Sequence, residues 1–76
     1  MQEQIHGSPI IARHDLGSRK GRIILVDRGG AGPGRFVTAW QGIGANGPDE
    51  EWSWGHYFGS ALEAHADFHA RAKRGY

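Results

Sequence analysis

The chain contains no cysteine in its 76 residues. This absence excludes disulfides and thiolate metal sites, which are common supports for small folds. A domain of this length buries only about 60% of the surface that its unfolded chain exposes, so its core alone gives little stability. We therefore expect association with another molecule to contribute, and we predict no cofactor.

Long apolar runs are also missing. No segment approaches the ~20 consecutive apolar residues of a membrane-spanning helix. The opening residues MQEQIHG have neither the basic start nor the apolar centre of a secretory signal. These absences predict a cytoplasmic protein that makes no contact with a membrane.

A strong excess of one charge is missing too, because nine basic side chains oppose eight acidic ones. Dedicated duplex-binding domains are usually far more basic, so the composition argues against strong nucleic-acid binding. The charges are nevertheless unevenly distributed. Five basic residues precede position 30, whereas residues 31–60 hold only Arg35 together with an acidic cluster at 49–51.

Familiar catalytic motifs are absent as well. The segment DRGGAGPGRF at 27–36 lacks the Gly-Lys-Ser/Thr ending of a phosphate-binding loop, and a strand rather than a helix is expected after it. We interpret it as a hairpin loop. No G-x-S-x-G motif occurs, and Ser60 is better explained as a helix cap. We therefore predict that the protein is not an enzyme.

Two histidines, His65 and His69, have the i,i+4 spacing of zinc ligands on a helix. The glutamate that would follow the first of them is replaced by Ala66, and a third ligand would have to come from His56 or His14. We predict no metal site and interpret the pair as half-buried histidines at a sheet edge.

The sequence does contain four strand-like segments rich in β-branched and aromatic residues, separated by Gly/Pro/Asn turns. These segments are 9–16, 22–28, 35–41 and 50–58. Their order predicts an α+β fold in which a four-stranded antiparallel sheet is followed by one C-terminal helix packed on one face. We expect residues 1–8 to form a flexible tail and residues 9–76 to form a single ββββα domain.

The predicted helix spans residues 61–74. Ser60 and Glu63 have the spacing of a capping box at its start, and Gly75 is placed to end it. A helical wheel indicates an inward face and an outward face. The inward face comprises Ala61, Leu62, Ala64, His65, Phe68, His69 and Ala72. The outward face comprises Glu63, Asp67, Arg71 and Arg74, with Asp67 and Arg71 able to pair at i,i+4.

Both faces of the predicted strands are apolar. In 22–28, for example, Ile23 and Leu25 alternate with Ile24 and Val26. One helix covers one face only, whereas the open face of an antiparallel sheet is normally polar. We therefore expect a cover for the second face: a second copy of the chain, a protein partner or stacked nucleotides. The alternative is that the chain's own loops fold back over it.

An acidic and aromatic cluster stands out at the start of segment 50–58. If that segment is regular, Trp52, Trp54, His56 and Phe58 point to one face. Acids around an aromatic anchor are typical of a protein-binding surface. The predicted partner-binding residues are Asp49, Glu50, Glu51, Trp52, Trp54 and Tyr57.

In its short length, lack of catalytic motifs and acid-plus-aromatic cluster, the chain resembles the small anti-CRISPR inhibitor proteins of phages and mobile elements. The resemblance implies a non-enzymatic inhibitor or adaptor that binds a protein complex, such as a CRISPR surveillance complex, and blocks its access to target DNA. We also expect a homodimer formed through the sheet.

The alternative is a homodimer that binds single-stranded nucleic acid on an aromatic stacking face. The side chains expected to contact nucleic acid in that case are Arg19, Lys20, Arg22, Arg35 and Trp40. The arginines and the lysine would follow the phosphates while the indole stacks on a base.

Overall fold

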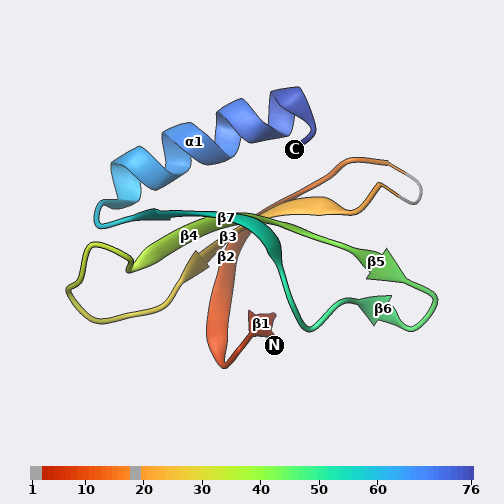
Figure 1. The fold of residues 1–76 in the computed structure, drawn as a ribbon, viewed down its shortest axis with the longest axis horizontal. Coiled ribbons are helices and arrows are strands. Elements are labelled where there is room, and N and C mark those ends of the chain that lie inside the picture. The colour runs from red at the N-terminus through yellow and green to blue at the C-terminus, as the bar shows by residue number, and fades with distance from the viewer. Residues whose placement is uncertain (1–2, 18–19) are drawn as a thin grey trace.

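The computed structural model describes residues 3–17 and 20–76. Figure 1 shows a curled antiparallel sheet with one helix lying along one of its faces. The main sheet has five strands in the order β1-β2-β3-β4-β7, and β5 pairs with β6 in a separate two-stranded sheet. The elements are β1 (Gln4–Ile5), β2 (Ser8–Asp15), β3 (Arg22–Asp27), β4 (Phe36–Gln41), β5 (Ile43–Gly44), β6 (Gly47–Pro48), β7 (Ser53–Phe58) and α1 (Ala61–Arg74).

The predicted α+β class is confirmed, and the four predicted strands correspond to β2, β3, β4 and β7. The largest difference in their bounds is at β7, which begins at Ser53 rather than at residue 50. Residues 50–52 belong instead to the connection that leads from β6 into the sheet. The acidic cluster therefore precedes the strand.

Helix α1 has the bounds that its capping signals predict. The Ser60 hydroxyl accepts a hydrogen bond from the Glu63 backbone N–H at 3.4 Å. At the other end Gly75 has φ 90°, and its N–H donates to the Arg71 carbonyl at 2.7 Å. A left-handed residue after the last turn is a common helix stop, and glycine adopts that conformation without steric cost.

The predicted inward face of the helix is wrong in part. The buried residues are Ala64, Phe68 and Arg71, which follow i, i+4, i+7 spacing, whereas Leu62 is 82% exposed. His65 and His69 are exposed, so they do not pack against the sheet. Arg71 lies inward because the sheet offers its guanidinium hydrogen-bond acceptors, which a wheel drawn from hydrophobicity does not include.

Two apolar clusters form the core, one on each side of the sheet. On the helix side, Ile23 and Leu25 of β3 and Phe36 of β4 pack against Ala64 and Phe68. On the opposite side, the cluster is formed by Ile5, Ile10, Ile24, Val26, Val37 and Ala39, with Trp52 packed against it. The central strands β3 and β4 thus bury both of their faces.

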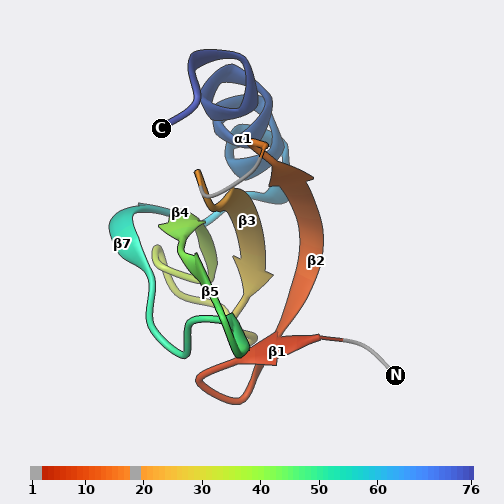
Figure 2. The same cartoon turned by 90° about the vertical axis from the view of Figure 1, so that its right-hand side faces the viewer.

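The prediction that the second face needs a cover from another molecule is wrong. Ile24, Val26, Val37 and Ala39 are all 0% exposed in the single chain. Figure 2 shows how this arises, because β2 bends strongly and β1 lies on the side of the sheet away from α1. The bend coincides with a break in register between Ile10 and Ala12, and such bulges increase the twist of a strand.

Residues 3–8 do not behave as the loose tail that the sequence predicted. Ile5 in β1 pairs with Ser8 in β2 and is only 3% exposed. The two residues between these strands, His6 and Gly7, have φ of 52° and 76°. Positive φ at both positions is the backbone of a tight two-residue hairpin. The remainder of the predicted tail, residues 1–2, lies outside the described residues.

The long loop expected after β4 contains a small hairpin. Ile43 pairs with Pro48 and Gly44 with Gly47, so β5 and β6 form a ribbon that projects beyond the main sheet (Figure 1). The Gln41 side-chain amide donates to the Asp49 carbonyl at 2.6 Å. This bond fixes the base of the ribbon against the end of β4.

The main argument for a homodimer was an uncovered sheet face, and a single chain covers both faces. The homodimer therefore stays a prediction. Within the described residues, the helix is too short and too polar to cross a bilayer.

Ile5→Ala tests whether β1 is part of the fold. Removing a buried isoleucine side chain costs about 2–5 kcal/mol of unfolding free energy, whereas a residue in a loose tail would contribute almost nothing. The milder Ile5→Val should cost about 0.5–1.5 kcal/mol. Ile11→Ala is the matched control, since Ile11 is 41% exposed, and its effect should be much smaller. Equal effects of the two alanine variants in urea denaturation would contradict the placement of β1.

Candidate functional site

Strand β7 departs from regular pairing in its middle. Thr38 of β4 lies opposite His56, but Trp40 lies opposite Ser53, so two residues of β7 face Ala39. This is a β-bulge, and Trp54 within it has φ 55°. A positive φ costs an L-residue about 1–2 kcal/mol. Such strained positions cluster at functional sites.

Trp54 keeps the face that alternation predicts, together with His56 and Phe58, whereas the bulge puts Trp52 on the opposite side of the sheet. The Trp54 ring lies 5.5 Å from that of Trp40, with the two planes tilted by 43°. Trp54 is 63% exposed, while Trp40 is half-buried and donates its indole N–H to the Lys20 carbonyl at 2.8 Å. Gly21 makes room for Trp40, because a Cβ at this position would lie 2.8 Å from the indole ring.

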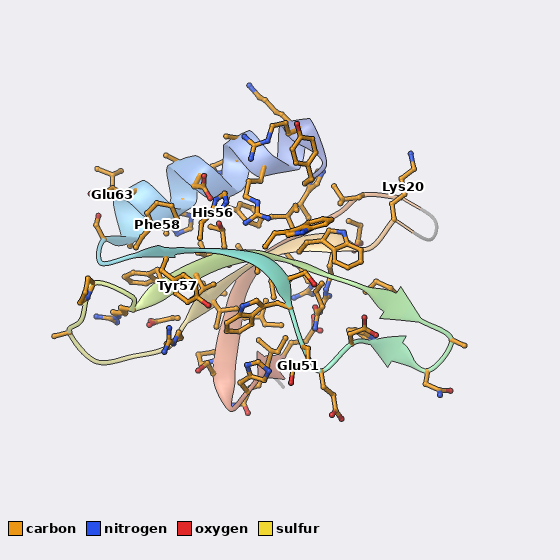
Figure 3. All side chains as sticks on the ribbon, viewed as in Figure 1. Lys20, Glu51, His56, Tyr57, Phe58 and Glu63 are labelled. Atoms are coloured by element: carbon orange, nitrogen blue, oxygen red, sulfur yellow. The ribbon has the colours of Figure 1, made fainter. Side chains whose placement is uncertain are left out.

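A hollow of about 380 Å³ lies next to this indole pair, on the helix side of the sheet. We call it the helix-side hollow. Its lining residues are Trp54, His56, Arg71, Arg74 and Tyr76. Figure 3 shows His56 pointing from β7 towards α1. The Arg74 guanidinium carbon lies 5.1 Å from the centre of the Tyr76 ring, so the hollow combines aromatic faces with positive charge.

Arg71 is the most deeply placed member of the hollow, with 1% of its surface exposed. Its Nη1 donates to the Thr38 carbonyl at 2.9 Å and to the Thr38 hydroxyl at 3.2 Å. Its Nε has no hydrogen-bond partner among residues 3–17 and 20–76. A buried N–H without a partner costs free energy, so Arg71 retains capacity to bind an acceptor.

A chain of hydrogen bonds continues from Thr38. The Thr38 hydroxyl donates to Asp67 Oδ2 at 2.5 Å, and His56 Nδ1 lies 3.0 Å from the same oxygen. Asp67 and Arg71 therefore meet through Thr38 rather than in the direct i,i+4 pair that the sequence predicted. The Asp67 carboxylate already bonds to Thr38 and His56. Among the described residues, no acidic side chain bonds to the Arg71 Nε.

The pKa values of both charged groups are shifted. Burial acts to raise the pKa of Asp67, but hydrogen bonds from Thr38 and His56 and the charges of His56 and Arg71 outweigh it, so this pKa is lowered. Burial lowers the pKa of Arg71, the charge of Asp67 opposes this, and the nearby positive charge of Arg74 adds to the lowering. An anion placed near Arg71 and Arg74 would relieve their mutual repulsion.

The predicted partner-binding residues are not gathered on one surface. Trp54 lies on the helix side, whereas Glu51 and Tyr57 lie on the side away from α1 (Figure 3). The Glu51 carboxylate lies 2.9 Å from His6 Nε2, within hydrogen-bonding distance. Asp49 and Glu50 are exposed in the connection that precedes β7. The expected acid-plus-aromatic patch is thus divided by the sheet.

The aromatic residues on the side away from the helix are partly used in folding. Trp52 packs on the apolar cluster of that side and lies 4.8 Å from the His6 ring. Tyr57 is 52% exposed, and the Arg28 guanidinium carbon lies 5.6 Å from its ring centre. A second hollow of about 430 Å³, the far-side hollow, is lined by His6, Ser8, Arg28, Trp52 and Tyr57.

The residues expected to contact nucleic acid are also divided. Arg22 is buried and bonds to Gln41 at 2.8 Å and to Glu3 at 2.6 Å. Arg35 pairs with Asp27 at 3.0 Å. These two arginines are held by neighbours within the fold, whereas Lys20 is exposed and Trp40 contributes to the helix-side aromatic pair. Arg19 lies outside the described residues.

Sequence reasoning missed Arg71, Arg74 and Tyr76 as members of a site. The spacing of Ala64, Phe68 and Arg71 is the one signal that could have placed the arginine on the buried stripe. His65 and His69 lie with ring centres 6.5 Å apart on the exposed side of α1. Within the part of the chain that the structure describes, no group of three His, Cys, Asp or Glu residues could hold a metal ion.

No family model matches the chain, and neither a curated protein nor a solved structure matches it. Evidence about its function therefore comes from the two hollows and from the charges around them. The helix-side hollow is distinguished by its strained, exposed tryptophan and its buried arginine.

Substitutions at Trp54 and Tyr57 should rank in opposite order. At position 54 the positive φ favours glycine, so Trp54→Gly should be more stable than Trp54→Ala by about 1 kcal/mol. Tyr57 has no such φ, and glycine within a strand costs roughly 0.5–1 kcal/mol relative to alanine, so Tyr57→Gly should be less stable than Tyr57→Ala. Urea denaturation of the four variants measures both differences. The same rank order at both positions would show that the bulge is not maintained in solution.

Proposed function

We propose that the protein binds single-stranded nucleic acid in the helix-side hollow. The observation that supports this function best is Trp54, which is 63% exposed at a strained backbone position and lies beside a second indole and two arginines. This arrangement is the combination of stacking platform and positive charge by which proteins bind unpaired strands.

The aromatic surface suits an exposed base. Trp54 and Tyr76 are both largely exposed, and Trp40 supports Trp54 from one side. Stacking of a base on an aromatic side chain contributes about 1–3 kcal/mol. Two stacked bases would therefore give useful affinity without any sequence-specific contact.

The positive charges near the hollow are available to phosphates. Arg74 lines the hollow and, among the described residues, forms no ion pair with an acidic side chain, in contrast to Arg22 and Arg35, although its Nη2 donates to the Tyr76 main-chain oxygen at 3.2 Å. Lys20 and Lys73 are exposed and also form no such pair in the described part of the chain. The acids at 49–51 precede β7, and Glu51 lies on the opposite side of the sheet (Figure 3). All members of the platform come from one chain, so the site does not require the predicted homodimer, which a mass measurement in solution would test separately.

Binding should be measured by the fluorescence anisotropy of a labelled oligothymidylate at low salt. Trp54→Ala should weaken binding by about 5- to 150-fold, because it removes one stacking surface. Arg74→Ala should reduce the slope of log affinity against log salt by about 1, as expected for the loss of one phosphate contact. Tyr57→Ala is the matched control on the opposite side of the sheet and should leave affinity unchanged.

Two results would contradict this function. One is the absence of binding to both DNA and RNA single strands at low salt. The other is an equal effect of Trp54→Ala and Tyr57→Ala, which would mean that strands do not bind at the helix-side hollow.

The second candidate is the protein-binding inhibitor or adaptor, of which an anti-CRISPR protein is the specific form. The observation that favours it is the exposed acidic pair Asp49 and Glu50, which forms no ion pair within the described residues. These acids would meet basic side chains on a partner, and in the anti-CRISPR form they would occupy a surface that otherwise binds target DNA. Acidic side chains in such a role mainly raise the association rate.

Reversal of the acidic cluster tests this candidate. A variant with Asp49→Lys, Glu50→Lys and Glu51→Lys should associate more slowly with a CRISPR surveillance complex, and its rate should depend less on salt. The readout is the rate of complex formation together with target-DNA binding by the complex. Lys73→Ala, a change of charge at an exposed position on α1 away from the acidic cluster, serves as the control. An unchanged association rate for the triple variant would remove the acidic cluster from the interface.

A further inference from the structure

The helix-side hollow has a charged group at its base that an ordinary stacking platform does not need. Arg71 is 1% exposed, and its guanidinium donates through Nη1 to Thr38 while Nε has no partner among the described residues. Buried arginines are normally paired because an unpaired buried charge is costly. The Arg71 Nε is therefore a buried donor that lacks an acceptor within the described residues.

The surroundings of Arg71 favour an anion and limit how it enters. Arg74 adds a second positive charge, and the nearest acid, Asp67, is held by Thr38 and His56. Arg71 lines the hollow but is almost fully covered, so steric hindrance there is greater for a phosphate within a strand, which carries chain on both sides. A phosphate at the end of a nucleotide has only one substituent and can extend to the base of the hollow.

The charge of a phosphate monoester and the volume of the hollow both agree with the binding of a terminal phosphate. A phosphate monoester carries about −1.5 to −2 charges at pH 7, against −1 for the diester within a strand. It also offers three acceptor oxygens in the geometry that a guanidinium binds best. A hollow of about 380 Å³ lies at the small end of the ~300–1,000 Å³ range of small-molecule sites.

We propose that the helix-side hollow binds a nucleotide that ends in a phosphate monoester, with the phosphate on Arg71 and the base stacked on Trp54. This inference rests on the proposed nucleic-acid function and specifies the part of the strand that is bound. The phosphate monoester can belong to the end of a strand or to a free nucleoside monophosphate.

The experiment compares ligands on the wild-type protein by anisotropy and by competition. An oligothymidylate with one terminal phosphate should bind about 10- to 100-fold more tightly than the same strand with hydroxyls at both ends, as expected for added charge-assisted hydrogen bonds. Blocking that phosphate as its methyl ester should abolish the gain. Free thymidine monophosphate should compete, and inorganic phosphate should compete more weakly because it has no base.

The variants Arg71→Lys and Trp54→Ala separate the two contacts. Arg71→Lys should lose most of the preference for the phosphorylated end while still binding the unphosphorylated strand, because lysine cannot make the same forked contact. Trp54→Ala should weaken both strands alike. If Arg71→Lys does not fold, as judged by circular dichroism, the comparison of ligands on the wild-type protein decides the question.

The outcomes distinguish this inference from the proposed function. Equal binding of phosphorylated and unphosphorylated strands overturns the inference and leaves strand binding intact. Binding of thymidine monophosphate without binding of any strand supports the phosphate site and overturns the strand-binding function. Inorganic phosphate competing as well as the nucleotide, or a phosphotyrosine peptide binding more tightly than it, overturns the nucleotide assignment.

Discussion

The constraint on which the rest of the molecule depends is that β3 and β4 are apolar on both faces. A short chain with one helix must cover two surfaces, and it does so with different devices. Ala64 and Phe68 of α1 pack on one face, while β1 and Trp52 close the other beneath a strongly bent β2. Small residues on the helix let it lie near the sheet, and the bend lets the sheet cover itself.

The irregular middle of β7 connects this architecture to the candidate site. Trp54 lies within the bulge opposite Ala39, on the helix side next to Trp40. At the same point in β4, the Thr38 carbonyl and hydroxyl accept hydrogen bonds from Arg71. A buried cation, an exposed indole and a break in strand pairing therefore occur together, and none of them contributes in an obvious way to hydrophobic stability. Because these three features coincide, we propose ligand binding at the helix-side hollow in preference to protein binding by the acidic cluster.

The parts of the fold that local chemistry decides could be predicted from the sequence. Ser60 and Gly75 delimit α1 because capping depends on neighbouring residues, and β3 is a run of β-branched and aliphatic side chains. The two-residue strands β1, β5 and β6 were missed because they are too short to show a pattern. The common face of Trp54, His56 and Phe58 was predicted, but Trp52 was misplaced because a bulge reverses alternation before Trp54, and the position of that bulge depends on pairing with β4. The burial of Arg71 depends on Thr38, which is distant in the chain.

The position of β7 at the end of the sheet has a consequence for self-association. It pairs with β4 on one side only, so its outer backbone groups form an edge to which a strand of another molecule could add. Natural proteins discourage such growth with bulges that twist an edge out of register. The bulge at Trp54, where the backbone has φ 55°, interrupts the regular edge along which a strand of a second copy would pair.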